Sequence, residues 1–346
     1  MNEEDGREVA AAERGAVTFR WDLDKTYLRT EFESLRKMVR IPFEAGADKV
    51  HLPGVPQLIQ QLRACAEKRG QRAYVFFLSA SPPQIGAAIE EKLALDGVAY
   101  DGIRFKDQLG HLVRGRWGSL TEQVGYKLGE LLSARARGPA SSREVLFGDD
   151  WESDPLIYSL YADVLAGEID GELLGRVLEA VGVARTAVAA IRDRAAPLYG
   201  SALGVVEKIF INLERRTPPS RFRPYGPRVV PTFNTVQAAA ALFESGHIDL
   251  DGVLAVATAI LGPDGGGGHR LRNSIDDLTR RGHLSLETRD RLVRGLARAG
   301  LAPLAREEEK LRARLRAALA RFRREKPPAG PARGADYEAL LAAFGP

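Results

Sequence analysis

Apolar and polar positions follow two different periods along the first half of the chain. The segment 73–81, AYVFFLSAS, is almost continuously apolar, as expected of a strand buried on both faces of a sheet. In the segment 54–70, by contrast, apolar residues recur at helical spacing, and Gly70 suits the end of a helix. The helical apolar positions are Val55, Leu58, Ile59, Leu62 and Cys65.

The strand pattern and the helix pattern alternate through the rest of the first half of the chain. Further strands are expected at 16–22, 102–106 and 144–150, and further helices at 83–97, 119–135 and 154–166. Strands that alternate with helices indicate a parallel sheet covered by helices. We therefore predict an α/β protein with a Rossmann-like, doubly wound parallel sheet.

The composition changes after residue 215. Residues 216–231 are rich in Pro and Arg and are predicted to form a linker. Beyond them only helical patterns are found, near 232–245, 250–261, 270–281, 286–299, 304–325 and 335–344. The predicted organisation is a disordered leader at 1–15, an α/β domain at 16–215, the linker at 216–231 and an all-helical domain at 232–346.

An internal echo occurs within this helical part. ESGHIDLDGV around His247 resembles RRGHLSLETR around His283, thirty-six positions later. In both, a Gly suits the end of one helix, and Asp249 or Ser285 suits the start of the next. Two stacked helical hairpins would explain the echo, and coincidence is the alternative.

Composition and charge narrow the class of protein only a little. The net charge of +4 on 346 residues is mild, and it gives no argument for a nucleic-acid-binding protein. A single cysteine, Cys65, excludes an intrachain disulfide. No apolar run is long enough to span a membrane, and the acidic start does not resemble a secretory signal. A cytoplasmic location is the expectation.

Candidate chemistry lies where the predicted strands end. Asp22 and Asp24 follow the first strand, and two carboxylates about 4 Å apart repel by roughly 4 kcal/mol at an effective dielectric constant of 20. Ligands of doubly wound sheets bind outside the carboxyl ends of the strands. The other polar residues expected there are Ser79, Lys127, Asp149, Asp150 and Asp154. Several carboxylates and one lysine balance when Mg²⁺ and a phosphate are bound, so we predict such a site.

Together these stretches resemble the four ordered motifs of the haloacid-dehalogenase-like (HAD) phosphohydrolases. Three segments narrow the resemblance to the catalytic domain of the actin-patch phosphatidate phosphatase family: LPGVPQLIQQL, FLSASPPQI and FGDDWESDPLIY. The resemblance covers roughly 16–165, under half of the chain. It implies a HAD core with a minimal cap, and a phosphatase.

The resemblance also implies roles for the candidate residues. Asp22 would attack phosphorus to give an aspartyl-phosphate, and Asp24 would act as general acid and then general base. Ser79 and Lys127 would hold the phosphoryl oxygens. Mg²⁺ would be bound by Asp22, the carbonyl of Asp24, Asp149 and either Asp154 or Asp150.

Two residues depart from the expected pattern. Lys25 stands where these relatives usually carry an acidic residue, and Arg20 interrupts an otherwise apolar strand. Neither change removes the nucleophile or the acid/base, but both bear on the substrate.

Two other segments allow a functional and a structural interpretation. GPDGGGGHR lacks the Gly-Lys-Ser/Thr ending of a phosphate-binding loop and is predicted to be a connector. The basic helix 307–326 could contact an anionic membrane or nucleic acid, or pack its leucines on its own domain.

The sequence thus predicts a Mg²⁺-dependent phosphomonoester hydrolase that acts on a phosphorylated lipid or macromolecular end. The alternative is a regulatory binding protein that uses the phosphatase-like domain as a scaffold and the helical domain for partner binding.

Overall fold

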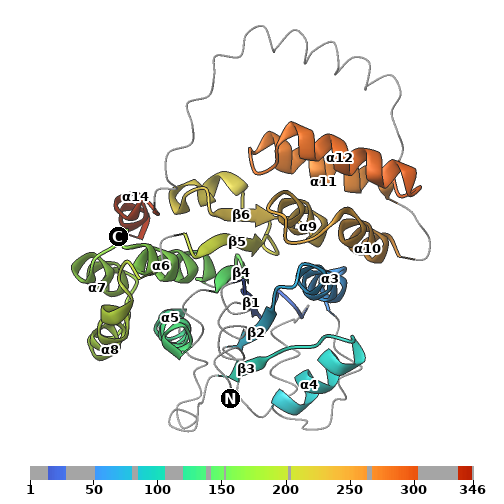
Figure 1. The fold of residues 1–346 in the computed structure, drawn as a ribbon. Coiled ribbons are helices and arrows are strands. Elements are labelled where there is room, and N and C mark those ends of the chain that lie inside the picture. Colours follow the sequence, from blue (N-terminus) through green and yellow to red (C-terminus); the bar gives the residue numbers. More distant parts are fainter. Residues whose placement is uncertain are drawn as a thin grey trace, which may run out of the picture.

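Six parallel strands form the central sheet of this computed structural model, in the spatial order 3-2-1-4-5-6 (Figure 1). In that order the strands are β3 (Gly102–Phe105), β2 (Ala73–Ser79), β1 (Val17–Asp22), β4 (Arg143–Asp149), β5 (Val206–Asn212) and β6 (Val229–Thr232). Strands β2 and β3 are added on one side of β1, and β4 to β6 are added on the other side. The point between β1 and β4 is therefore the switch point of a doubly wound fold. The structure describes residues 15–28, 51–79, 85–105, 120–137, 142–151, 153–201, 204–262, 267–302 and 334–344.

Helices cover both faces of this sheet (Figure 1). One face carries α5 (Leu120–Arg137), α6 (Asp154–Ala166), α7 (Gly171–Ala180) and α8 (Arg185–Ala195). The other carries α3 (Val55–Lys68), α4 (Gly86–Leu95), α9 (Thr235–Glu244) and α10 (Leu250–Leu261), with α11 (Gly268–Arg280) and α12 (Leu286–Arg298) outside them. The fold confirms the predicted α/β class with a parallel sheet and a helical C-terminal region.

The strands are apolar on both faces because each face lies under a helical layer. Along β4, Val145 and Phe147 belong to the core beneath α3 and α9, whereas Leu146 belongs to the core beneath α5 and α6. This accounts for the continuous apolar runs in the sequence, which are typical of parallel strands. The period of two also places Arg20 and Asp22 on the α5–α6 face.

The edge of the sheet differs from the prediction. The structure has β6 at Val229–Thr232, preceded by the 3₁₀ helix η5 (Pro219–Tyr225), in a segment that we expected to be a linker. Its strand residues pair in parallel with β5. Pro231 is tolerated because β6 is an edge strand, where a missing N–H donor costs little. The Pro-rich composition therefore indicated an edge rather than a connection between domains.

The helical region has the two hairpins that the sequence echo indicated. Gly246 and Gly282 end α9 and α11 with φ of 78° and 82°, in the left-handed region that favours glycine. Asp249 accepts a hydrogen bond from the N–H of Gly252, and Ser285 from the N–H of Thr288, so both cap the next helix. The α11–α12 hairpin packs against the α9–α10 hairpin (Figure 1).

The end of the chain returns to the opposite face of the sheet. Helix α14 (Tyr337–Phe344) lies beside α7 and η5. Buried Asp163 of α6 accepts hydrogen bonds from the Tyr337 hydroxyl at 2.7 Å and the Ala335 N–H at 2.8 Å, and it also pairs with Arg228. These contacts join the C-terminal helix to the same layer that carries the predicted catalytic residues.

Some predictions fall outside the described residues. They include residues 1–14 of the leader predicted at 1–15, the basic helix 307–326 and the segments 29–50 and 106–119, where a cap insertion would lie. Among the helices that are described, none combines the length and apolar character needed to cross a membrane.

Candidate active site

Two buried aspartates end adjacent strands at the switch point of the sheet. Asp22 is the last residue of β1 and Asp149 the last residue of β4, and both are fully buried. The strands pair in parallel up to Trp21 and Phe147, so their carboxyl ends meet at one edge. This edge is where doubly wound folds bind ligands.

The loop after β1 brings Asp24 to Ser79 at the end of β2. The Ser79 hydroxyl donates to Asp24 Oδ2 at 3.1 Å, and the Leu23 N–H continues the strand pairing to the Leu78 carbonyl at 3.2 Å. Lys25 then takes a left-handed φ of 56°, which turns the chain sharply after Asp24. The turn therefore directs two carboxylates, two residues apart, toward one edge of the sheet.

Lys127 reaches the site from α5. Helix α5 buries Val124, Leu128 and Leu131 against the sheet, and Lys127 lies on this buried side with none of its surface exposed. Its ammonium donates to Asp22 Oδ1 at 2.7 Å and to Asp154 Oδ1 at 2.8 Å. The lysine thus links Asp22 at the end of β1 to Asp154 at the start of α6.

Asp154 depends on a glycine for its position. It is the first residue of α6, and its Oδ2 accepts a hydrogen bond from the N–H of Asp149 at 3.2 Å. A Cβ atom added at Gly148 would lie 2.7 Å from Asp154 Cβ and 2.8 Å from a ring carbon of Tyr158. Only glycine therefore allows α6 to begin this close to the end of β4.

Asp150 points elsewhere. Its two carboxylate oxygens accept hydrogen bonds from the backbone N–H groups of Arg215 and Thr217, at 2.9 and 3.1 Å. It holds the loop after β5 rather than facing the other carboxylates. Of the two candidates that the sequence left open, Asp154 is the one that lies in an acidic group with Asp22 and Asp149.

Three carboxylates form a group that fits a metal ion. Asp22, Asp149 and Asp154 each offer an oxygen within 4.8 Å of the others, and all three are buried. Carboxylate oxygens are the ligands that Mg²⁺ prefers. Three buried negative charges beside one ammonium leave a net negative charge in a low-dielectric site, which a divalent cation would neutralise. The donor set therefore fits a divalent metal.

Arg20, which interrupts the first strand, has a structural partner. Its guanidinium donates to Glu144 Oε2 at 2.7 Å and to Oε1 at 3.1 Å. Arg135 and the Tyr161 hydroxyl donate to the same carboxylate at 3.3 and 2.9 Å. Burial raises the pKa of Glu144, but Arg20 and Arg135 outweigh it and hold this pKa below its usual value.

A cationic rim that the sequence analysis missed lies beside the site. The Lys25 ammonium lies 3.2 Å from the centroid of the Trp151 ring, and the Arg215 guanidinium lies 4.5 Å from the same centroid. The Asn212 side chain donates to the Lys25 carbonyl at 3.0 Å and fixes the turn. Trp151 immediately follows the Asp-Asp pair, so an aromatic residue at that position was the available signal. The rim places positive charge next to the carboxylate cluster.

Asp22, Asp149 and Asp154 thus form one buried acidic group, with the Lys127 ammonium beside it, at the switch point of a doubly wound sheet. Residues 21–173 match the family described as "Phosphatidate phosphatase APP1, catalytic domain". This match confirms the resemblance seen in the sequence motifs, and it spans less than half of the 346 residues. No curated protein and no solved structure matches the chain.

Proposed function

We propose that the protein is a Mg²⁺-dependent phosphomonoester hydrolase that works through an aspartyl-phosphate on Asp22. The observation that carries the proposal is the convergence of Asp22, Lys127 and Asp154 at the switch point of a fold matched to a phosphatase catalytic domain. An intact nucleophile and acid/base pair also argue against a purely scaffolding role.

Asp22 supplies the nucleophile. One of its oxygens forms a bond to phosphorus as the bond between phosphorus and the leaving oxygen breaks, which yields an aspartyl-phosphate and an alcohol. A carboxylate is a recognised nucleophile for phosphoryl transfer. The hydrogen bond from Lys127 to Asp22 Oδ1 orients the carboxylate.

Asp24 moves the protons. In its protonated form it would donate a proton to the leaving alkoxide, and as a carboxylate it would then take one from the water that attacks the aspartyl-phosphate. The reaction returns Asp22 and releases inorganic phosphate. The hydrogen bond from Ser79 to Asp24 Oδ2 holds this carboxyl group in place.

The remaining polar groups handle charge. Lys127 and Ser79 would bind oxygens of the transferred phosphoryl group, since stabilising this charge is the larger part of such catalysis. Asp22, Asp149, Asp154 and the carbonyl of Asp24 would hold Mg²⁺, which supplies charge neutralisation when it is bound. The geometry favours Asp154 over Asp150 as the final ligand.

The substrate class we favour is a phosphorylated lipid, as the name of the matched family suggests. The Lys25–Trp151–Arg215 rim supports an anionic substrate whose group beyond the phosphate is large enough to reach an aromatic surface. The alternative substrate class is a phosphorylated macromolecular end.

Turnover of para-nitrophenyl phosphate, short-chain phosphatidate and a 5′-phosphorylated oligonucleotide should be measured with and without Mg²⁺. We expect metal-dependent release of phosphate, fastest from phosphatidate. The absence of turnover with every substrate would contradict the proposal and favour a regulatory binding protein.

Metal binding should be tested separately from activity. Mg²⁺ should raise the unfolding temperature of the substrate-free protein, because a ligand that binds only the folded state stabilises it. Asp149→Asn should remove this effect, whereas the matched control Asp150→Asn should keep it. Equal behaviour of the two variants would show that the metal site is misassigned.

A further inference from the structure

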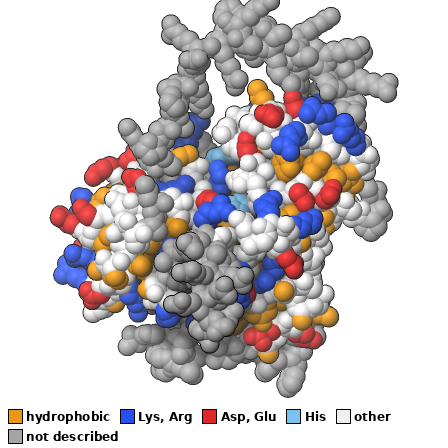
Figure 2. Space-filling model, in the orientation of Figure 1, with side chains coloured by type: hydrophobic (Ala, Val, Ile, Leu, Met, Phe, Trp, Pro, Cys, Tyr) orange, Lys and Arg blue, Asp and Glu red, His pale blue; other side chains and the backbone are white. Residues whose placement is uncertain are grey.

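A cavity lined by charged side chains lies away from the active site. It has a volume of about 920 Å³ and is enclosed by η5, β6, α9 and the turn between α11 and α12. Figure 2 shows Lys, Arg and His side chains gathered near the middle of the face drawn, next to the parts of the chain that Figure 1 labels β6 and α9. The proposed phosphatase mechanism uses none of the residues that line this cavity.

The charge lining the cavity is mainly positive. Lys208, Arg223 and Arg281 face it, with Glu244 as the carboxylate among the lining residues. Glu244 already accepts two hydrogen bonds from the N–H of Ser285, at 2.9 and 3.1 Å. The cations therefore exceed the negative charge available to them within the cavity wall.

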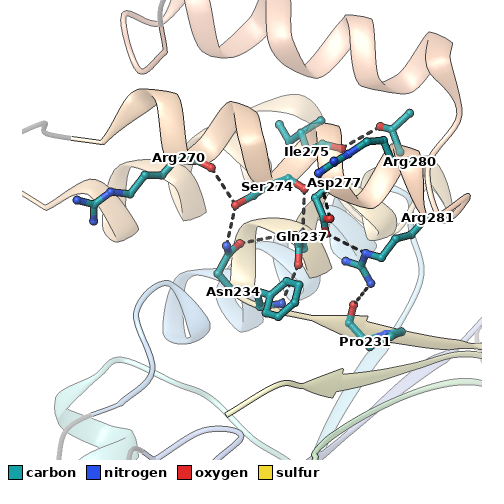
Figure 3. A network of polar contacts seen from close by, with 11 residues as sticks. Pro231, Asn234, Gln237, Arg270, Ser274, Ile275, Asp277, Arg280 and Arg281 are labelled. Atoms are coloured by element: carbon teal, nitrogen blue, oxygen red, sulfur yellow. Dashed lines mark hydrogen bonds and ion pairs between the residues drawn. The ribbon is translucent and has the colours of Figure 1, made fainter. Parts of the chain in front are cut away.

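Arg281 lines the cavity, and one of its guanidinium nitrogens has no hydrogen-bond partner among the described residues. Its Nε donates to Asp277 at 2.8 Å and its Nη1 to the Pro231 carbonyl at 2.6 Å, as Figure 3 shows. Its Nη2 is buried and has no hydrogen-bond partner among the described residues. A buried donor without a partner is unfavourable, and an acceptor that reached it would relieve this.

His283 lines the same cavity as Arg281. Burial, followed by the charges of Arg281 and Lys208, lowers its pKa to about 4, and Asp277 opposes the shift. Its ring is therefore neutral at pH 7 and can donate one N–H. The ring lines the cavity together with Arg281 and Lys208.

Part of the wall is apolar. Phe222, Val229 and Leu284 are buried and line the cavity, and Leu286, 47% exposed, lies at its rim. Cations on one side and apolar side chains on the other suit a ligand that carries both a charged and an apolar part.

From this geometry we propose that the cavity binds an organic phosphate with an apolar portion. The phosphate would lie among Lys208, Arg281 and His283, with Arg223 at the entrance, and the apolar portion would lie against Phe222 and Leu284. Guanidinium groups suit phosphate because they donate two parallel hydrogen bonds.

The proposed site is separate from the active site. Lys208 lies opposite Val145, whereas four residues further along the same strands Asn212 lies opposite Asp149. Four residues of strand span about 13 Å, and the cavity lies at the β6 edge of the sheet, two strands away from β4. A ligand in this cavity would therefore bind independently of a ligand in the active site.

Binding can be followed through the histidine ring signals in the NMR spectrum of the full chain, which has five histidines. The probe is hexylphosphonate, which has no ester bond to cleave. We expect a saturable shift of the His283 signal and a rise in its pKa as the phosphonate offsets Arg281, Lys208 and Arg223. Inorganic phosphate should bind more weakly, since it lacks the apolar portion.

Variants test the assignment. Lys208→Gln combined with Arg223→Gln should weaken binding about ten-fold or more, because two charge-assisted contacts are lost. Arg221→Gln is the matched control, since Arg221 is exposed on the same 3₁₀ helix and does not line the cavity. Phosphatase turnover should be unchanged in all these variants.

Several results would overturn the proposal. They are a His283 signal that saturating hexylphosphonate does not move, equal affinities of the double variant and the parent protein, and a response to phosphatidate vesicles without a response to hexylphosphonate. Equal affinities for inorganic phosphate and hexylphosphonate would overturn the apolar portion of the ligand. Circular dichroism of each variant would establish that it is folded.

Discussion

Two buried ionic clusters lie on the α5–α6 face of β1, two residues apart along the strand, yet they differ in charge. Around Glu144, one carboxylate accepts hydrogen bonds from Arg20, Arg135 and Tyr161. Around Lys127, one ammonium is shared by Asp22 and Asp154, with Asp149 close by. The strands are the same, but the excess charge has the opposite sign.

The difference separates a structural cluster from the one that we propose to be catalytic. A carboxylate surrounded by donors needs no further partner, and breaking such a buried pair exposes an uncompensated charge. Three carboxylates beside one lysine retain repulsion that a metal ion and a phosphate can use. Variants in the two clusters should therefore fail in different ways.

The largest effect is expected from Asp22→Asn. This change removes the nucleophile and a metal ligand while it keeps the shape of the side chain, so phosphatase turnover should fall to background. Circular dichroism should show a folded protein. Turnover near the parent rate would mean that another residue attacks phosphorus.

Glu144→Gln should act on stability instead. Two buried guanidinium groups would lose their carboxylate, at a cost of about 3–5 kcal/mol in the free energy of unfolding. Urea unfolding would measure this loss. KM should change little at a temperature where the variant stays folded, and a selective loss of turnover without loss of stability would contradict the structural assignment.

Gly148→Ala probes the link between the carboxylate cluster and the backbone. The added methyl group would collide with Asp154 and Tyr158, so α6 would shift and Asp154 would move away from Lys127. We expect a loss of turnover of about 10²-fold, since displacement of a catalytic group by about 1 Å can have this effect. The Mg²⁺-induced rise in unfolding temperature should shrink in parallel, and an unaltered rise would contradict the proposed role of Asp154.

A smaller effect is expected from His283, which lies among cations rather than carboxylates. Its pKa is lowered to about 4 in the folded state, from an ordinary value of 6.5. Between these values the unfolded chain binds the proton more tightly, so stability falls as the pH drops from 6.5 toward 4. His283→Gln should remove about 1–2 kcal/mol of the stability difference between pH 7.5 and pH 5, measured by urea unfolding.

The placement of the candidate residues at one edge of the sheet could be predicted because its signal is local. Asp22, Ser79 and Asp149 each end a strand, and the carboxyl ends of parallel strands must meet at one edge. Lys127 required the family motif, since helical periodicity alone did not distinguish it from Lys92. The orientation of Asp150 depends on backbone groups of the loop after β5, which are distant in sequence.

The edge of the sheet was harder to predict. Proline and arginine dominate the segment before β6, and an edge strand of four residues carries little periodic signal. The basic cavity joins Lys208 of β5 to Arg281 and His283 at the end of α11, across more than seventy residues. Only the folded arrangement of the hairpins places these cations together.

The most direct test of the central claim is rapid chemical quench of Asp24→Asn with para-nitrophenyl phosphate, followed by mass spectrometry. Nitrophenolate leaves without a proton, so Asp22 should still be phosphorylated, but the general base that activates water, Asp24, is lost. Each proton-transfer role contributes about 10²–10⁴-fold. We predict accumulation of phosphate on Asp22 with little steady-state turnover. The absence of a phosphorylated protein, or phosphate on any other residue, would contradict the account.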